Sequence, residues 1–196
     1  MTRIRLTETL REVQRCQLCA GELPHPPRPV VRASVEARIL IIGQAPGVRV
    51  HQSGVPWDDP SGDRLRDWMG LSSNDFYDES QVAIMPMGFC YPGKGRAGDL
   101  PPRKECAPHW HSHLLACLPN IQLTLLIGRY AQHYYLTHSG DTVTDTVKDW
   151  QAYLPEYLVL PHPSPRNFVW LSRNPWFTED LLPVLRRLVR DVLEPV

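Results

Sequence analysis

Residues 38–47 read RILIIGQAPG, and this stretch decides the fold class. After Arg38 it continues with an unbroken apolar run of strand length, rich in β-branched residues, which is typical of a strand buried on both faces. Glycine follows at once, so the strand ends in a tight loop. The stretch therefore predicts a parallel sheet that helices cover on both sides.

Further strands and helices alternate along the rest of the chain. Strands are predicted at residues 81–85, 121–127 and 157–160. Apolar spacing and capping residues predict helices at residues 8–13, 61–70, 108–118, 131–136 and 178–192. The alternation shows neither an internal repeat nor an interdomain linker. It predicts one domain over residues 1–196, a three-layer α/β/α fold with a central, mostly parallel four-stranded sheet.

Composition excludes several classes of protein. A chain of 196 residues, 42% hydrophobic and 21% charged, is neither a mini-protein nor a disordered segment. Lys plus Arg and Asp plus Glu both total 21, so a nucleic-acid partner has to be met by a local basic patch. The N-terminal residues lack the apolar run of a signal peptide, and no apolar run is long enough to cross a bilayer. We expect a cytoplasmic monomer with no membrane partner.

Each predicted strand runs into a polar loop that carries glycine or proline. The loops are GQAPG at 43–47, MPMGFCYPG at 85–93, GRYAQ at 128–132 and PHPSPRN at 161–167. In the last loop, prolines stiffen the backbone that presents His162, Ser164, Arg166 and Asn167. Because the carboxyl ends of parallel strands share one edge, where ligands bind, we expect all four loops to meet there.

GQAPG, the GVPW that follows it at 54–57, and HPSPRN at 162–167 together resemble the signature loops of the uracil-DNA glycosylase superfamily. The first two are similar to the first motif of the bacterial and archaeal family 4 enzymes. HPSPRN is similar to the DNA-insertion loop of single-strand-selective monofunctional glycosylases. The resemblance covers residues 16 to 175 and implies that Ser164, Pro165, Arg166 and Asn167 contact DNA. For Arg166 a solvated surface position is the alternative.

Four of the five cysteines fit the same resemblance. Cys16 and Cys19 form a CxxC pair, and Cys90 and Cys106 follow downstream, as in the cluster-bearing family 4 enzymes. Four thiolates suit either a 4Fe-4S cluster or tetrahedral zinc, and the resemblance favours the cluster. The cluster would tie residues 16–19 to residues 90–106. Cys117 lies in an apolar helical face and is expected in the core.

The resemblance also implies a set of base-binding residues. Trp57 would stack on the extruded base, with a core aromatic as the alternative. His162 would donate a hydrogen bond to the departing base, with a cap or core histidine as the alternative. Gly43 lets the backbone approach closely, so Gln44 would also face the base. Met85 completes the set.

The chain departs from the superfamily at the catalytic positions. Family 4 carries Glu where this chain has Gln44, and other families carry Asp or Asn where it has Ala45. Neither substitute takes a proton at neutral pH, although the Gln44 carbonyl could orient a water. The similar family 5 enzymes carry an Asp just before SG, much as Asp59 precedes PSG here. We therefore expect Asp59, His162 and Gln44 to act in catalysis, or Asp59 to be a plain helix cap.

Met85 bears on the choice of base, since it stands where the superfamily often has Asn to read the uracil edge. Without that amide, hypoxanthine or xanthine becomes an alternative substrate. Packing around the cluster loop is the alternative role for this methionine, and both interpretations stay open.

The predicted function is a DNA glycosylase of base excision repair that hydrolyses the N-glycosidic bond of a deaminated base. The alternative is a catalytically degenerate iron-sulfur protein that binds damaged or single-stranded DNA without cleaving it. Hydrolysis of a free nucleoside is disfavoured by the rigid, arginine-bearing HPSPRN loop. Basic residues near the expected rim would contact phosphates: Arg49, Lys94, Arg96, Arg103, Lys104, Arg166 and Arg173.

Overall fold

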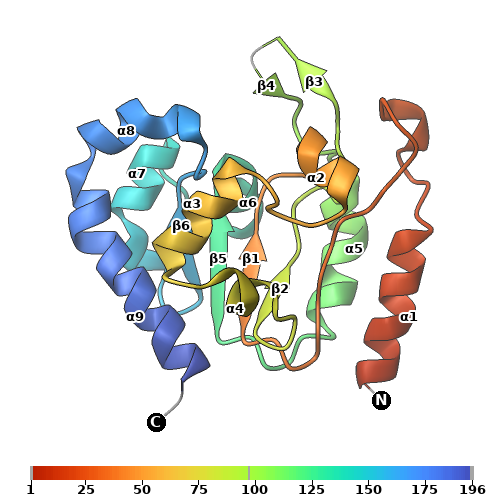
Figure 1. The fold of residues 1–196 in the computed structure, drawn as a ribbon, viewed down its shortest axis with the longest axis horizontal. Coiled ribbons are helices and arrows are strands. Elements are labelled where there is room, and N and C mark those ends of the chain that lie inside the picture. The colour runs from red at the N-terminus through yellow and green to blue at the C-terminus, as the bar shows by residue number, and fades with distance from the viewer. Residues whose placement is uncertain (1, 97, 195–196) are drawn as a thin grey trace.

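The protein is built around a four-stranded parallel sheet with the strand order β2-β1-β5-β6 (Figure 1). A computed structural model describes residues 2–96 and 98–194. The strands are β1 (Ile39–Ile42), β2 (Val82–Ile84), β5 (Leu123–Ile127) and β6 (Tyr157–Leu160). All the paired strands of this sheet run parallel, so their carboxyl ends share one edge, as the sequence predicts.

Helices cover both faces of the sheet, which confirms the predicted three-layer α/β/α fold. In Figure 1, α3 lies in front of the sheet and α6 behind it. α9 packs against α3, and α1 packs against α5. The helices are α1 (Thr2–Gln14), α2 (Val48–Ser53), α3 (Pro60–Met69), α4 (Ser73–Tyr77), α5 (Cys106–Leu115), α6 (Arg129–Tyr135), α7 (Val143–Lys148), α8 (Phe168–Arg173) and α9 (Leu182–Leu193).

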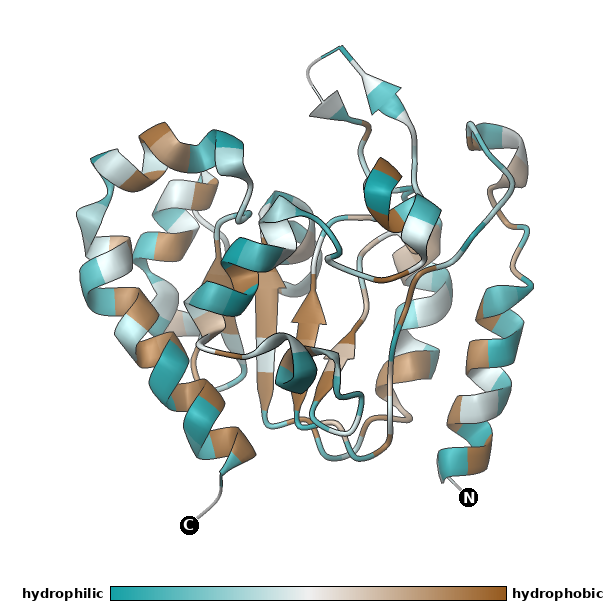
Figure 2. Cartoon of the chain, viewed as in Figure 1, coloured by the Kyte–Doolittle hydropathy of each residue, from teal (hydrophilic) through white to brown (hydrophobic). Residues whose placement is uncertain are grey.

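The central strand β1 has no exposed face. Its four side chains are at most 1% exposed, because helices pack on one side and the other of the sheet. Figure 2 shows the strands as the apolar centre of the molecule. Burying an Ile or Leu side chain contributes roughly 1.5–3 kcal/mol relative to leaving it exposed. The apolar run at residues 39–42 is therefore a main source of folding energy.

The predicted C-terminal helix at residues 178–192 lies within a continuous helical stretch, residues 175–193. Within it, residues Phe177–Leu181 form a π turn, and α9 continues from Leu182. Pro183 stands in the first turn of α9, and proline has no N–H to continue the hydrogen bonds of a preceding helix. The regular α-helical series of backbone hydrogen bonds is therefore interrupted at Pro183.

Several short elements escape prediction from the sequence. They are α2, α4, α7, α8, the 3₁₀ turns Ala20–Glu22, Trp150–Tyr153 and Pro165–Asn167, and the hairpin of β3 (Lys94–Gly95) and β4 (Gly98–Asp99). Segments of two to six residues are too short to show a helical or strand period. Among the described residues, no helix combines the length and apolar character needed to cross a membrane.

Candidate functional site

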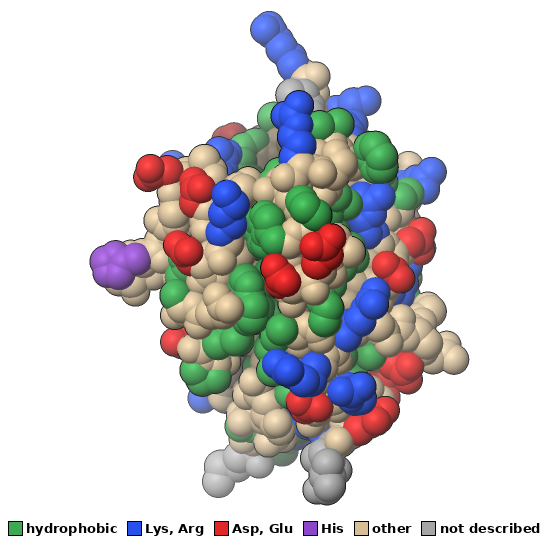
Figure 3. Space-filling model, turned by 90° about the vertical axis from the view of Figure 1, so that its left-hand side faces the viewer, with side chains coloured by type: hydrophobic (Ala, Val, Ile, Leu, Met, Phe, Trp, Pro, Cys, Tyr) green, Lys and Arg blue, Asp and Glu red, His purple; other side chains and the backbone are tan. Residues whose placement is uncertain are grey.

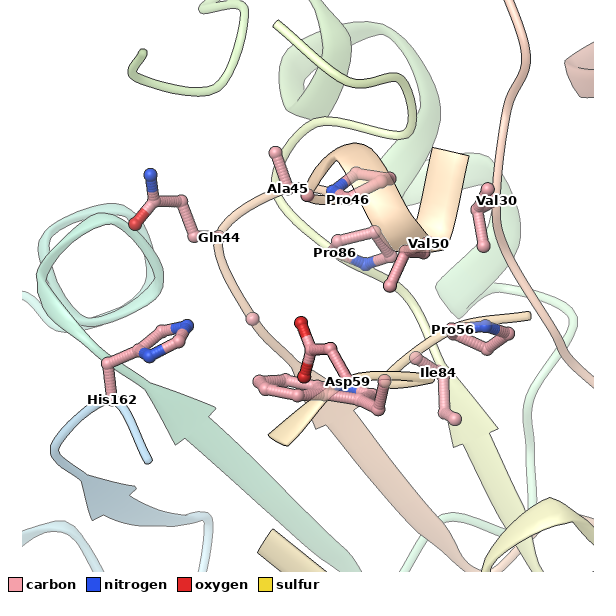
Figure 4. A pocket seen from close by; sticks show the side chains of 13 residues that line it. Val30, Gln44, Ala45, Pro46, Val50, Pro56, Asp59, Ile84, Pro86 and His162 are labelled. Atoms are coloured by element: carbon pink, nitrogen blue, oxygen red, sulfur yellow. The ribbon is translucent and has the colours of Figure 1, made fainter. Parts of the chain in front are cut away.

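A small pocket lies at the carboxyl edge of the sheet, where the loops after β1, β2 and β6 meet (Figure 4). Its volume is about 50 Å³. The residues that line it are Val30, Gly43, Gln44, Ala45, Pro46, Gly47, Val50, Pro56, Trp57, Asp59, Ile84, Pro86 and His162. The structure thus brings GQAPG, GVPW and the start of HPSPRN to one place, which we call the base pocket.

Trp57 is fixed in the base pocket by two glycines. A Cβ atom on Gly43 would lie 2.8 Å from Cζ2 of the Trp57 ring, so only glycine lets the ring rest on the first loop. A Cβ on Gly62 would lie 1.7 Å from the Trp57 carbonyl oxygen. Trp57 itself has a positive φ of 58°, a conformation that is uncommon outside glycine. The ring is packed against the core on one side and lines the base pocket on the other.

Asp59 caps helix α3 and lines the base pocket at the same time. Its Oδ1 accepts a hydrogen bond from the Gly62 N–H at 2.9 Å, in the manner of an N-cap. Figure 4 shows the carboxylate pointing into the pocket, toward which the His162 ring also points. The cap holds the carboxylate in one orientation, so the two interpretations made from the sequence do not exclude each other.

His162 enters the base pocket directly after β6. Its ring centroid lies 5.8 Å from that of Trp57, at an interplanar angle of 36°. Burial lowers the pKa of His162 below its ordinary value of 6.5, although the carboxylates of Asp59 and Asp99 oppose this shift. The imidazole is therefore neutral at neutral pH, and one ring nitrogen carries a proton that it can donate.

The loop that follows His162 is held by hydrogen bonds at both ends. Asn167 donates from Nδ2 to the His162 carbonyl at 2.6 Å, and the Ser164 hydroxyl accepts from the Arg166 N–H at 3.2 Å. Pro165 opens the 3₁₀ turn. Arg64 of α3 donates to the Ser164 carbonyl at 2.9 Å. Helix α3 therefore positions both Asp59, through its cap, and the loop, through Arg64.

A wider hollow of about 410 Å³ opens beside the base pocket. It shares Gln44, Asp59 and His162 with the pocket and adds residues of the β3–β4 hairpin and of the 164–166 loop. We call this hollow the mouth of the base pocket. Arg166 lines the mouth, and its Nη1 lies close to Gly98, since a Cβ atom added to Gly98 would be 3.1 Å from it. Figure 3 shows Lys and Arg side chains at the top of the face it displays, the end where the hairpin lies, and mixed charges elsewhere. The hairpin and the loop form the two sides of the entrance.

Sequence reasoning missed Asp99 and Arg64. Asp99 belongs to β4 and lines the mouth together with Asp59. Burial raises the pKa of Tyr91, and the hydrogen bond from the Tyr91 hydroxyl to Asp99 raises it further. The turn signals PG and AGD at residues 92–99 could have indicated a hairpin. They do not indicate which residues it would face.

Two of the predicted base-binding residues, Gln44 and Met85, do not lie inside the pocket with the others. Gln44 stands at the rim, where its Nε2 lies 3.5 Å from the Leu100 carbonyl oxygen. Met85 is 1% exposed and packs in the hydrophobic core instead of lining the pocket. Successive side chains of an extended chain point to opposite sides, so Ile84 and Pro86 face the pocket and Met85 points away. Met85, predicted as a base-binding residue, therefore does not line the base pocket.

The buried His111 holds the backbone of Pro86, which lines the base pocket, by a hydrogen bond. Its Nε2 lies 3.1 Å from the Pro86 carbonyl oxygen, which can only accept, so Nε2 carries the proton. Nδ1 then accepts from the Tyr135 hydroxyl at 2.6 Å. Burial lowers the pKa of His111 to about 4.

This buried histidine predicts a pH dependence of stability. The unfolded chain binds a proton at His111 below pH 6.5, whereas the folded chain does so only below about 4, so stability falls as the pH drops through this window. The loss amounts to about 3 kcal/mol. Urea unfolding between pH 7.5 and 4 measures it, and His111→Gln is expected to reduce the pH slope. The exposed neighbour His109 supplies the control His109→Gln, and an unchanged slope in His111→Gln would contradict the prediction.

Cys16, Cys19, Cys90 and Cys106 line a second pocket together. The Phe89 N–H donates to the Cys106 sulfur at 3.3 Å, and the Trp110 indole N–H donates to the Cys16 sulfur at 3.4 Å. Burial raises the pKa of Cys90 to about 11 and that of Cys106 to about 12, so as free thiols they stay protonated. Cys117 is fully buried in the core, away from this pocket, as predicted.

The arrangement of these sulfurs bears on which metal group they fit. In residues 2–96 and 98–194, no three His, Cys, Asp or Glu side chains are placed to hold one metal ion together. A zinc ion draws its four thiolates to about 2.3 Å from one point, whereas a 4Fe-4S cluster has each of four cysteines bind a different iron at a corner of a larger body. The four cysteines line one hollow, and N–H groups donate to the sulfurs of Cys16 and Cys106.

Comparison with known protein families agrees with the geometry. A family model described as the uracil DNA glycosylase superfamily matches residues 31–186, which include all the residues that line the base pocket except Val30. The match covers well over half of the chain and the whole parallel sheet. On this ground the chain belongs to the uracil DNA glycosylase superfamily.

Proposed function

We propose that this protein hydrolyses the N-glycosidic bond of a deaminated base in DNA. The observation that carries the proposal is the base pocket, where a capped carboxylate, Asp59, and a neutral imidazole, His162, share one small cavity with the Trp57 ring. A nucleotide extruded from the DNA stack needs these groups to hold and release its base. Membership of the superfamily supports the same reaction class.

Each group has a task in this reaction. The Trp57 ring stacks on the base, and the His162 N–H donates to the base oxygen on which negative charge develops as the bond breaks. Asp59 accepts a proton from the attacking water or stabilises the positive charge on the sugar. Ser164, Pro165, Arg166 and Asn167 enter the DNA at the gap left by the base.

The walls of the base pocket bear on which base is taken. Ile84 and Pro86 are apolar, and the Pro86 carbonyl is already engaged by His111. Among the described residues that line the pocket, the one side-chain amide is that of Gln44, which stands at the rim and not beside Ile84 and Pro86, so paired hydrogen bonds to uracil are not expected at this wall. We infer a substrate range that includes hypoxanthine or xanthine besides uracil.

The four cysteines would hold a 4Fe-4S cluster in the proposed holoprotein. When bound, such a cluster supplies a rigid link, or an electron-transfer centre, between the segment after α1 and the segment before α5. The Trp110 and Phe89 N–H groups would donate to the sulfurs of Cys16 and Cys106. Pro27 and Pro29 line the same pocket, so a bound cluster would also hold this proline-containing segment in place.

Base release from oligonucleotides tests the proposed function. Single- and double-stranded DNA containing uracil, hypoxanthine or xanthine is incubated with wild type, and His162→Ala is expected to slow release about 10²–10³-fold. The exposed His113 supplies the matched control His113→Ala. No release from any substrate, with DNA still bound, would overturn the proposal and favour a non-cleaving DNA-binding protein.

A further inference from the structure

A second carboxylate, that of Asp99, lies at the mouth of the base pocket. Asp99 lines the mouth together with Gln44, Asp59 and His162, but it does not line the base pocket itself. It comes from the β3–β4 hairpin, which stands above α2 at the carboxyl edge of the sheet (Figure 1). The reaction proposed above gives this carboxylate no task.

Two contacts hold the Asp99 carboxylate in place. Its Oδ2 lies against the first loop, since a Cβ atom added to Gly47 would be 3.3 Å from it. The carboxylate also accepts a hydrogen bond from the hydroxyl of Tyr91, which is only 6% exposed. The Tyr91 ring in turn packs against His25 and His51, at centroid distances of 6.2 and 6.0 Å. A carboxylate that a buried donor orients is preorganised, which is what an electrostatic role in catalysis requires.

The division between pocket and mouth decides which part of a nucleotide each carboxylate faces. A base stacked on Trp57 fills the base pocket, so the attached sugar lies farther out, in the mouth. Asp59 lines both cavities and therefore reaches the bond between base and sugar. Asp99 lines only the mouth, and its charge, like that of Asp59, raises the pKa of His162 against the effect of burial. Asp99 is therefore on the sugar side of the site, within electrostatic range of His162.

The chemistry of the N-glycosidic bond calls for negative charge on this side. When the bond breaks, its electron pair leaves with the base, and positive charge develops on the sugar. A water oxygen then bonds to the sugar carbon, and Asp59 takes the proton that the water gives up. The first loop, residues 43–47, contributes no carboxylate of its own. In glycoside hydrolysis two carboxylates divide these tasks between them.

For DNA binding alone, a carboxylate in the mouth is unfavourable. Lys94 and Arg166 line the same mouth and suit the phosphates of DNA, whereas Asp99 repels them. A charge that weakens binding of the substrate can still speed the reaction, provided that it stabilises the transition state more than it destabilises the bound substrate. The positive charge on the sugar exists only in the transition state, so Asp99 meets this condition.

We propose that Asp99 is a second catalytic carboxylate, which stabilises the positive charge on the sugar while Asp59 accepts the proton from water. The proposal rests on the function proposed above and adds a residue with a separate role to it. Asp99 forms no covalent bond in the reaction. Tyr91 is a positioning residue, because its hydroxyl orients the Asp99 carboxylate.

Asp99→Asn is expected to change base release and DNA binding in opposite directions. Single-turnover release should slow about 10- to 100-fold, less than for a buried group, because Asp99 is exposed before DNA binds. Binding is measured with an oligonucleotide that carries the 2′-fluoro form of the deaminated nucleotide that wild type releases fastest, since the fluorine makes the glycosidic bond resist cleavage. The affinity for this DNA should rise roughly 2- to 5-fold, the range for one exposed pair of charges.

Three further variants make the test specific. Asp99→Glu keeps the charge and should keep much of the rate. Tyr91→Phe keeps the packing of the ring but frees the carboxylate, so release should slow while DNA binding stays as in wild type. Asp149→Asn, at an exposed position after α7 that lines neither the pocket nor the mouth, is the matched control and should change neither quantity.

The outcomes separate this proposal from the proposed function. If wild type releases a base and Asp99→Asn does so at the same rate, Asp99 has no catalytic role, while the proposed function stands. If Asp99→Asn is slower but also binds DNA more weakly, the carboxylate only supports the structure of the hairpin, and the proposal is again overturned. If wild type releases no base, both proposals fail. Slower release with tighter binding in Asp99→Asn, and neither change in Asp149→Asn, supports the second carboxylate.

Discussion

Asp59→Asn is expected to slow base release about 10²–10⁴-fold, because an amide cannot take a proton from water. Asn caps helices about as well as Asp, and its side-chain oxygen can still accept from the Gly62 N–H. The melting temperature should therefore stay close to that of wild type. Single-turnover base release and thermal unfolding of the same preparations measure the two quantities.

Three further variants make this test specific. Asp63→Asn, in the first turn of the same helix and exposed, should leave the rate unchanged. Asp59→Ala should lose the cap as well, at a cost of about 0.5–2 kcal/mol in stability. If Asp59→Asn releases the base at the wild-type rate, Asp59 acts only as a helix cap. If Asp99→Asn lost base release instead, the carboxylate that accepts the proton from water would be Asp99 of the hairpin.

Cys106→Ser is expected to remove the iron and the visible absorption of the protein purified without air. A cluster bound by these cysteines would close a long loop between the segment after α1 and α5, in the way that a disulfide does, and such a link would contribute about 2–4 kcal/mol. For a chain of this size we expect the melting temperature to fall by roughly 5–15 °C. Metal analysis, absorption spectra and thermal unfolding provide the measurements.

Cys117→Ala is the matched control for the cysteine prediction. Cys117 is more deeply buried than Cys106 but lies outside the cysteine pocket, so we expect this variant to bind as much iron as wild type does. Wild type that is colourless and free of iron would contradict the cluster, and one zinc per chain would favour the tetrahedral site. Because Cys106 lies away from the base pocket, partial base release by Cys106→Ser would indicate a structural role for the cluster.

The parts of the site that the sequence predicted are those encoded by neighbouring residues. The apolar run of β1, the glycine that ends it, and the cap sequence DPSG each act within a few positions of the chain. The loops at the strand ends follow from these, since parallel strands bring their carboxyl ends to one edge. For this reason the base pocket contains Gly43, Trp57 and His162, as expected.

The parts that the sequence did not predict depend on contacts between distant segments. Met85 and Pro86 are adjacent in the chain, yet packing sends one into the core and the other to the pocket. Asp99 reaches the mouth only because a short hairpin folds back over it, and Arg64 meets Ser164 from a different helix. No pattern of neighbouring residues predicts these contacts between distant segments.

The sequence by itself determined the layers of the fold, the order of the loops and the chemical groups available at the edge of the sheet. The tertiary structure alone decided which carboxylates face His162, that His111 is buried neutral, and that the Asp99 carboxylate lies against Gly47. The physical reason is that periodicity and capping act between neighbours in the chain. Burial, pKa shifts and pocket walls arise only when close packing brings remote segments together.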